Sequence, residues 1–132
     1  MRVVIDTNVL VSAVLTRGVP RKTLSHVMRF HTIVCSIQVL DEYRRVLRNS
    51  EFDHYVPRDT RLTLLKALEG TEIVHISESL AISRDPDDDM IIETALKGNA
   101  DVLVTGDSDI LSLRPLHDID IVTPAEFVKK YI

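Results

Sequence analysis

The sequence is poor in cysteine and in aromatic residues. Its 132 residues include one cysteine, three tyrosines, three phenylalanines and no tryptophan. A single cysteine excludes an internal disulfide, and the position of Cys35 in the apolar run TIVCS predicts a buried thiol. Because few aromatic side chains are present to stack on bases, any bound nucleic acid would be held mainly through its backbone and shape.

A long apolar run is also missing. The N-terminal stretch MRVVIDTNVLVSAVL is interrupted by Asp6 and Asn8, and it is too short and too polar to span a membrane. It also lacks the small-residue cleavage site of a secretory signal. We therefore expect a cytoplasmic protein with no membrane contact. The length, with 45% hydrophobic residues, predicts one globular domain, residues 1–132.

Basic residues are fewer than acidic ones, and the formal net charge is −4. This balance is not typical of a protein that holds nucleic acid through a large basic surface. It does not exclude a nucleic-acid enzyme, because carboxylates that hold divalent cations count as negative until the metal is bound.

Short apolar runs alternate with stretches of helical periodicity along the chain. The runs are rich in β-branched residues and predict strands at 3–5, 32–36, 72–76, 101–105 and 118–122. Apolar residues at helical spacing predict helices at 8–15, 21–30, 37–48, 58–68 and 88–97. Strands that are apolar throughout and alternate with helices indicate the α/β class, with a parallel sheet covered on both faces.

Two helix ends carry recognisable signals. Gly98 follows the helix that begins near Asp87 and is typical of a C-terminal cap. In TPAEF, Thr123 is a candidate N-cap, Pro124 suits the first helical position and Glu126 completes a capping box. We therefore expect the last helix to begin at Thr123.

Acidic residues occupy four positions near the predicted carboxyl ends of strands. Asp6 follows the first strand and Asp107 follows the fourth, while Glu42 lies early in the helix after the second strand and Asp88 begins the helix before the fourth. Ligands of open parallel sheets bind at the carboxyl ends of the strands. The pattern therefore predicts that four connections each bring one carboxylate to the same edge.

The stretch SRDPDDDMIIETA concentrates acidic residues at one helix start. Asp85 before Pro86 is a good N-cap, and Asp87 in the first turn complements the helix dipole. Asp88 differs, because it shares a helical face with apolar residues at 91, 92 and 95. A carboxylate on a buried face requires a partner, and a metal ion would supply one. A shift of one residue in the helix start would exchange Asp88 with Asp89.

Each acidic residue taken alone has an ordinary structural explanation. Asp6 could cap the helix after the first strand, Glu42 could pair with Arg44 or Arg45, and Asp107 could cap the short turn SDILSL. These explanations do not account for the acidic residue at every strand-end position.

A group of carboxylates is typical of a divalent metal site. Carboxylates within a few ångströms repel one another unless cations lie between them. Mg²⁺ and Mn²⁺ prefer oxygen ligands, and two such ions can generate a hydroxide and stabilise the leaving oxygen of a phosphodiester. The five histidines show no H-x-x-x-H spacing, and the sequence has no G-x-S-x-G motif. The residues therefore favour metal-dependent hydrolysis without a protein nucleophile.

Four blocks of the sequence, in this order, resemble the PIN-domain family: VVIDTNVLVSA, SIQVLDEYRRVL, DPDDDMIIETALKGNADVLVTGDSDIL and TPAEF. The chain is similar in particular to the VapC-type ribonucleases, the toxins of toxin–antitoxin pairs. The resemblance implies a three-layer α/β/α fold with a central parallel five-stranded sheet, and Mg²⁺- or Mn²⁺-dependent cleavage of RNA by two-metal-ion hydrolysis. It implies catalytic, metal-binding roles for Asp6, Glu42, Asp88 and Asp107, an auxiliary metal-binding role for Asp109, and supporting roles for Asn8 and Thr105.

The resemblance also implies partners. Such toxins self-associate, so a homodimer or higher homo-oligomer is expected, and they are inhibited by an antitoxin protein. Two basic groups are candidates for contact with RNA phosphates: Arg44, Arg45 and Arg48 on the helix of Glu42, and Arg17, Arg21 and Lys22 near the end of the first helix. Alternatively, these residues form solvated faces or pair with acidic neighbours.

Other functions fit the sequence less well. The start VVIDTNV is similar to that of haloacid-dehalogenase phosphatases, but Asn8 replaces the second aspartate of their D-x-D motif. An EF-hand calcium loop beginning at Asp85 would need Gly and Glu where Met90 and Leu96 stand. A non-catalytic PIN-fold interaction module is the alternative from another class, and a structure-specific flap nuclease would need a longer chain.

Overall fold

The computed structural model describes residues 1–77 and 86–132, and at Pro86 and Asp87 it describes the backbone alone. The N-cap expected at Asp85 and the dipole contribution expected from the Asp87 side chain lie outside the described residues. Within the described ranges, no helix has the length and apolar character needed to cross a membrane.

A five-stranded, all-parallel sheet forms the centre of the fold, as predicted. Its strands lie in the order β3-β2-β1-β4-β5. In the central strand, Val3 pairs with Ile33 of β2 and with Val102 of β4. The strands are β1 (Arg2–Ile5), β2 (Thr32–Ser36), β3 (Glu72–Val74), β4 (Val102–Val104) and β5 (Asp120–Val122).

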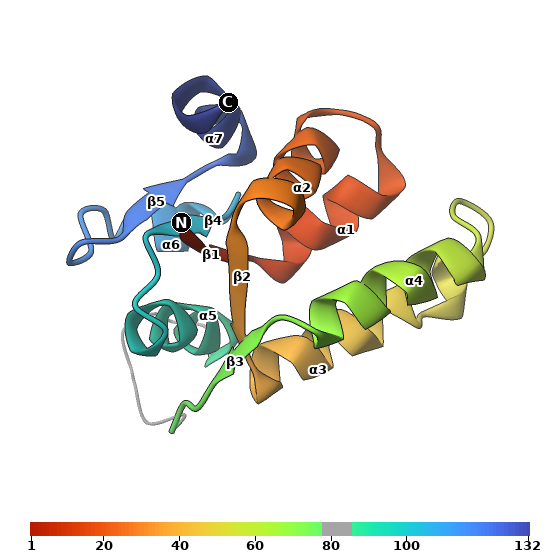
Figure 1. The fold of residues 1–132 in the computed structure, drawn as a ribbon, viewed down its shortest axis with the longest axis horizontal. Coiled ribbons are helices and arrows are strands. Elements are labelled where there is room, and N and C mark those ends of the chain that lie inside the picture. Colours follow the sequence, from red (N-terminus) through yellow and green to blue (C-terminus); the bar gives the residue numbers. More distant parts are fainter. Residues whose placement is uncertain (78–85) are drawn as a thin grey trace.

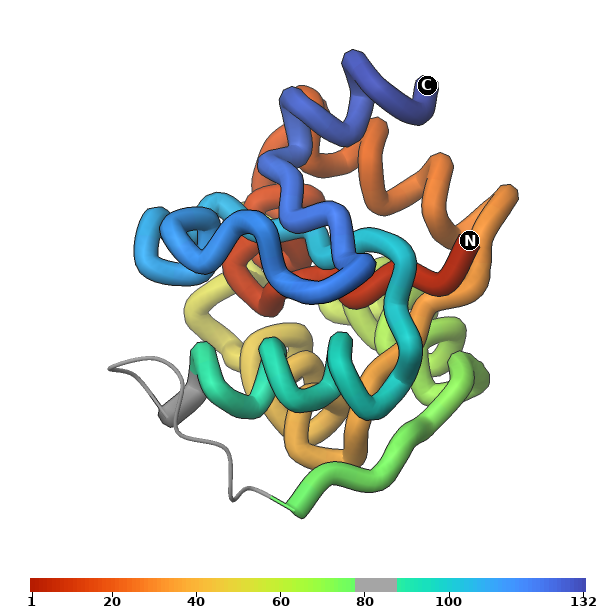
Figure 2. Tube along the Cα trace, turned by 90° about the vertical axis from the view of Figure 1, so that its left-hand side faces the viewer, coloured from red at the N-terminus to blue at the C-terminus, as the bar shows by residue number. Residues whose placement is uncertain are grey.

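Helices cover both faces of the sheet, which gives three α/β/α layers (Figure 1). On one face lie α1 (Thr7–Leu15), α2 (Val19–Phe30) and α7 (Pro124–Tyr131), and on the other lies α5 (Pro86–Lys97). Figure 2 shows α5 and α7 on opposite sides of the sheet in a second view. Because both faces are covered, all three residues of β4 and the last three of β1 are buried.

The remaining helices extend the structure sideways and close the turn after β4. The helices α3 (Ile37–Leu47) and α4 (Arg58–Glu69) pack on each other and form an arm that reaches away from the sheet (Figure 1). The 3-10 helix η1 (Ser50–Phe52) lies in the connection between them. The short α6 (Ser108–Leu111) follows β4. The predicted elements are therefore present, with boundaries that differ by up to two residues.

The end of α5 departs from the expected cap in one detail. Gly98 follows the last helical residue, but the left-handed residue is Asn99, with a φ of 50°. The Ala100 amide closes the turn by donating to the Ala95 carbonyl at 2.9 Å. Glycine suits position 98 for another reason, since a Cβ atom there would lie 2.6 Å from Cγ1 of Val34 in β2. Close packing, and not backbone conformation, explains this glycine.

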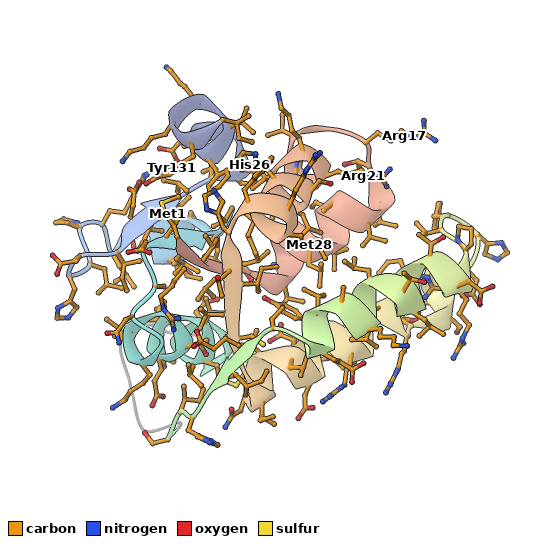
Figure 3. The ribbon with its side chains drawn as sticks, viewed as in Figure 1. Met1, Arg17, Arg21, His26, Met28 and Tyr131 are labelled. Atoms are coloured by element: carbon orange, nitrogen blue, oxygen red, sulfur yellow. The ribbon has the colours of Figure 1, made fainter. Side chains whose placement is uncertain are left out.

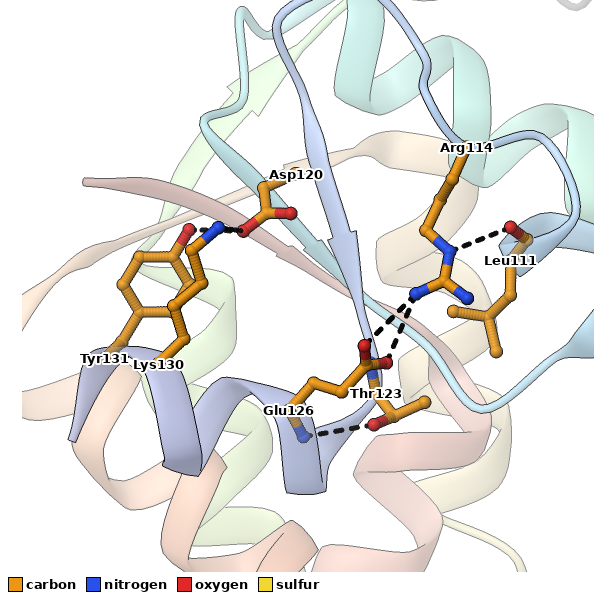
Figure 4. Close-up of polar contacts among 7 residues, drawn as sticks. All are labelled: Leu111, Arg114, Asp120, Thr123, Glu126, Lys130 and Tyr131. Carbon is orange, nitrogen blue, oxygen red and sulfur yellow. Dashed lines mark hydrogen bonds and ion pairs between the residues drawn. The ribbon is translucent and has the colours of Figure 1, made fainter.

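The predicted start of the last helix is confirmed. Thr123 is the N-cap of α7, and its hydroxyl accepts from the Glu126 amide while the Glu126 carboxylate accepts from the Thr123 amide (Figure 4). The other end of α7 is fixed to β5, because Lys130 and Tyr131 both donate to Asp120, at 2.7 and 2.5 Å. The thiol of Cys35 is buried in the core, as predicted, and this burial raises its pKa.

Candidate metal centre

The candidate centre lies where the connections of the sheet change direction. The strands β1 and β4 are neighbours, but the chain continues from β1 to β2 on one side and from β4 to β5 on the other. Ligands of open α/β sheets bind at such a point, beyond the carboxyl ends of the strands. Asp6 directly follows β1, and Asp107 follows β4 after Thr105 and Gly106.

Thr105 connects the two aspartates that follow these strands. Its side chain is fully buried, and its hydroxyl donates to Oδ2 of Asp6 at 2.7 Å. The hydroxyl oxygen of Thr105 in turn accepts from the Asp107 amide at 3.0 Å. A hydroxyl can donate once and accept as well, so one side chain orients both acidic residues. Thr105 thus contacts both Asp6 and Asp107, and its supporting role at a metal site stays a prediction.

Asp6 has the backbone position of an N-cap. It precedes α1, and no hydrogen bond of ordinary capping geometry joins its side chain to the described first turn, although the nearby backbone amides of Asn8 and Thr7 lower its pKa. The carboxylate is only 7% exposed. Burial raises its pKa, the hydroxyl of Thr105 opposes this shift, and the nearby charge of Asp107 adds to it. The carboxylate thus lies in surroundings that disfavour its charge unless a cation is present.

Asp107 comes together with two further aspartates at this edge. Asp88, Asp107 and Asp109 each offer a carboxylate oxygen, and these oxygens lie within 4.8 Å of one another. Asp88 is buried in the first turn of α5, whereas Asp109 is exposed. Oδ1 of Asp107 also accepts from the Asp109 amide at 2.7 Å, so Asp107 caps α6 as well. A carboxylate has two oxygens, so the cap and a metal-binding role are compatible.

The neighbouring Asp89 is in a different position. It is partly exposed and is not among the grouped carboxylates, whereas Asp88 is 9% exposed and belongs to the group. This placement agrees with the helix register that favours Asp88, and its role as a ligand stays a prediction.

Glu42 lies on α3 and is not among the grouped carboxylates, so its role as a ligand stays a prediction. Its neighbour Tyr43 is buried and donates a hydrogen bond to the Ile5 carbonyl, just before Asp6. Burial raises the pKa of Tyr43 well above its usual range, and the charges of Asp6 and Glu42 contribute to the shift. Both carboxylates therefore lie near this hydroxyl. Arg44, a candidate partner of Glu42, instead pairs with Asp41 at 2.8 Å and Glu69 at 3.0 Å.

The basic candidates differ in their surroundings. Arg21 caps the end of α1, because its guanidinium donates to the carbonyls of Ala13 and Val14 at 2.9 and 2.8 Å. Arg17 extends outward from the loop between α1 and α2 (Figure 3). The exposed candidates, which form no ion pair with another described residue, are Arg17, Lys22, Arg45 and Arg48. Of the proposed phosphate contacts, Arg21 and Arg44 are therefore committed to other groups.

Two buried polar features that involve α5 were not predicted from the sequence. Glu93 is 3% exposed and accepts from both the amide and the hydroxyl of Ser77, each at 2.8 Å. The fully buried hydroxyls of Ser36 and Thr94 lie 2.9 Å apart and connect the start of α3 with α5. A carboxylate inside an otherwise apolar helical stretch could have indicated Glu93, but no local signal pairs Ser36 with Thr94.

The ligand set suits a hard divalent cation. The residues that the structure groups here all offer carboxylate oxygens, which Mg²⁺ and Mn²⁺ prefer. The unfavourable interaction of Asp6 with Asp107 is what a bound cation would relieve.

A family model described as PIN domain matches residues 2–109, a stretch that contains all of these acidic residues. The chain belongs to the PIN-domain family. An uncharacterized protein of Methanocaldococcus jannaschii is 28% identical to this PIN domain over 144 aligned positions, which cover 99% of the chain and 92% of that protein. Nuclease activity is typical of the family, which supports a hydrolase.

The fold is also similar to that of a solved structure. A chain in the crystal structure of VapBC2 from Rickettsia felis, bound to a DNA fragment from their promoter, superposes with a TM-score of 0.60. The two chains are 19% identical, and the match covers 93% of this PIN domain and 98% of the other chain. At this identity, the likeness establishes the shared fold.

Proposed function

We propose that this PIN domain is a metal-dependent endoribonuclease that hydrolyses RNA phosphodiester bonds. The observation that carries the proposal is the group of carboxylates from Asp88, Asp107 and Asp109, within 4.8 Å of one another at the edge where Asp6 is buried. Such a group at a topological switch point is suited to holding cations against a phosphate.

The acidic residues would act together as metal ligands. Asp6, Glu42, Asp88 and Asp107 would hold Mg²⁺ or Mn²⁺, with Asp109 as an auxiliary ligand. When bound, these ions supply a hydroxide from water and neutralise charge on the leaving oxygen. Thr105 keeps the Asp6 carboxylate oriented toward the centre, and its contact with the Asp107 amide keeps the two strand ends in register. Without bound metal ions, the negative charges of these residues would repel the phosphates of an RNA backbone and oppose its binding.

A toxin–antitoxin role accompanies this activity in the proposal. The likeness to the VapBC2 structure supports an antitoxin protein as partner. A homo-oligomeric assembly is part of the proposal on the resemblance to VapC-type ribonucleases alone. The cytoplasmic location stays a prediction from the sequence.

The test is cleavage of a mixed single-stranded RNA pool with and without Mg²⁺ or Mn²⁺. Wild type should cut when metal is present, and Asp6→Asn should lose this activity. Asp118→Asn is a matched control, because it makes the same substitution at an exposed aspartate outside the centre. Equal cutting by the wild type and Asp6→Asn, or none by the wild type with either metal, contradicts the proposal.

A second pair of variants tests which aspartate of α5 takes part. Asp88→Asn should abolish cleavage, because Asp88 belongs to the group of carboxylates, whereas Asp89→Asn should leave most of it. The reverse result would show that Asp89 is the ligand.

A further inference from the structure

A small cavity adjoins the candidate centre and is lined by residues of α1, α2 and α7 and of the loop after β4. Its volume is about 220 Å³. Asp107 belongs both to the group of carboxylates and to the wall of this cavity, so the two sites adjoin. The other residues that line it are Asn8, Val9, Ser12, Pro20, Gly106 and Pro124.

Two polar side chains of the cavity remain available to a ligand. Asn8 and Ser12 lie one turn apart on the same side of α1, and neither side chain forms a hydrogen bond with residues 1–77 or 86–132. The amide of Asn8 offers two donors and one acceptor, and the hydroxyl of Ser12 offers one donor and two lone pairs. The Asp6 carboxylate accepts from the Thr105 hydroxyl, whereas the side chain of Asn8 is exposed.

Asp107 is the one charged residue among the described residues that line the cavity, and its negative charge argues against a phosphate as the occupant. No arginine or lysine in the described part of the chain lines the cavity. Helix starts at such a site could bind an anion through free amides, but Pro20 near the start of α2 and Pro124 at the start of α7 have none. Together with Val9, the prolines form apolar surfaces that suit the face of a planar group.

The size of the cavity limits the occupant further. Pockets for drug-sized ligands measure roughly 300–1,000 Å³, and this one is smaller. It suits one ring system with polar edges, placed beside a phosphate held at the carboxylates. In RNA, that description fits a base.

We propose that this cavity binds the base of one nucleotide adjacent to the cleaved bond, and that Asn8 and Ser12 determine which base is preferred. The inference rests on the proposed ribonuclease function. The edges of the bases differ in their patterns of hydrogen-bond donors and acceptors, and amide and hydroxyl side chains of proteins can distinguish these patterns. The phosphates are bound at the acidic centre, so the cavity supplies selectivity and the centre supplies chemistry.

The experiment is sequencing of the cut sites in a randomised RNA 12-mer pool, with Mn²⁺ present. Ser12→Leu fills the cavity and Asn8→Ala removes its amide. With either variant, the four bases should occur at nearly equal frequency at the one position beside the cut where the wild type has a preference. Both substitutions should also raise KM for the preferred sequence about tenfold, with a smaller change in kcat. Ser25→Leu is the control, because it places leucine at an exposed serine of α2 outside the cavity, and it should keep the wild-type preference.

The possible results distinguish a failure of the base site from a failure of the proposed ribonuclease function. Mn²⁺ should raise the melting temperature of both variants as much as that of the wild type, which shows that the fold and the acidic centre are intact. Wild-type cutting without base preference, or an unchanged preference in Asn8→Ala and Ser12→Leu, overturns the base site and leaves the nuclease. If the wild type cuts no RNA, the proposed function fails and the inference fails with it.

Discussion

At the scale of single residues, Thr105 illustrates how one buried hydroxyl organises a charged site. It contacts Asp6 and Asp107, which are separated by most of the chain, and it has no exposed surface of its own. Loss of a buried hydrogen-bond partner costs more than the bond itself contributes, because the remaining group is desolvated without compensation. The hydroxyl is therefore expected to affect both stability and metal binding.

Thr105→Val should destabilise the protein by about 1–3 kcal/mol, because it leaves the Asp107 amide and Asp6 Oδ2 without this partner. Since the hydroxyl lowers the pKa of Asp6, the variant should also need a higher pH for the same Mn²⁺ affinity. Urea unfolding and Mn²⁺ titrations at several pH values measure the two effects. Thr105→Ser retains the hydroxyl and should restore the wild-type pH dependence; if it does not, the methyl group and not the hydroxyl is responsible.

Asp6 should oppose folding of the metal-free protein at neutral pH. Its pKa in the folded state is raised, chiefly by burial, so its contribution to stability is favourable below the unfolded-state pKa and is lost as the pH rises through the folded-state pKa. Asp6→Asn should therefore stabilise the metal-free protein at pH 7 and have little effect at acid pH, where the carboxyl is protonated. Chemical unfolding in EDTA across this range is the measurement. A variant less stable than the wild type at pH 7 would contradict the sign.

At the scale of elements, the acidic centre depends on how α3 and α5 are held together. The hydroxyl of Ser36 caps α3 by accepting from the Val39 amide and contacts Thr94 of α5, whose hydroxyl also approaches the Met90 carbonyl at 2.7 Å. Glu42 lies on the first of these helices and Asp88 on the second. This buried contact therefore sets the relative position of two candidate ligands.

Thr94→Val should lower Mn²⁺ affinity while keeping the fold, because valine has nearly the shape of threonine but lacks the hydroxyl. Its cost in unfolding free energy should be about 1–3 kcal/mol, since Ser36 loses a buried partner. Calorimetric Mn²⁺ titration is the measurement, and Thr94→Ser should recover the affinity. Wild-type affinity in Thr94→Val would show that the contact does not position the ligands.

At the scale of the whole molecule, cation binding and folding are linked. The carboxylates come from separate connections of the sheet, so the complete site exists only in the folded state, and a ligand that binds this state alone stabilises it. At a free cation concentration 100 times the dissociation constant, binding adds about 2.7 kcal/mol to the free energy of unfolding.

Mn²⁺ should accordingly raise the melting temperature of the wild type, and much less that of Asp6→Asn. Asp118→Asn, which alters an exposed aspartate elsewhere, should respond as the wild type does. Differential scanning calorimetry with and without the ion gives the comparison. Equal shifts in wild type and Asp6→Asn would argue against a shared site that includes Asp6.

The order of elements, the sheet class and several local details could be read from the sequence. Periodicity and caps depend on residues within a few positions of one another, so the strands, the helices and the capping box of Thr123 and Glu126 were predictable. The positions of Asp6 and Asp107 at strand ends followed from the same pattern, because the carboxyl ends of parallel strands share one edge.

The tertiary structure alone decided which side chains meet. Thr105 and Asp6 are 99 residues apart, and Ser36 and Thr94 are 58 apart, so their contacts depend on strand register and helix packing and not on local sequence. The same holds for Arg21, which is committed to the end of α1, for the close approach of Val34 to Gly98, and for the cavity that Asp107 lines. Local interactions determine the elements of this PIN domain, whereas the geometry of its candidate site arises from the way those elements pack.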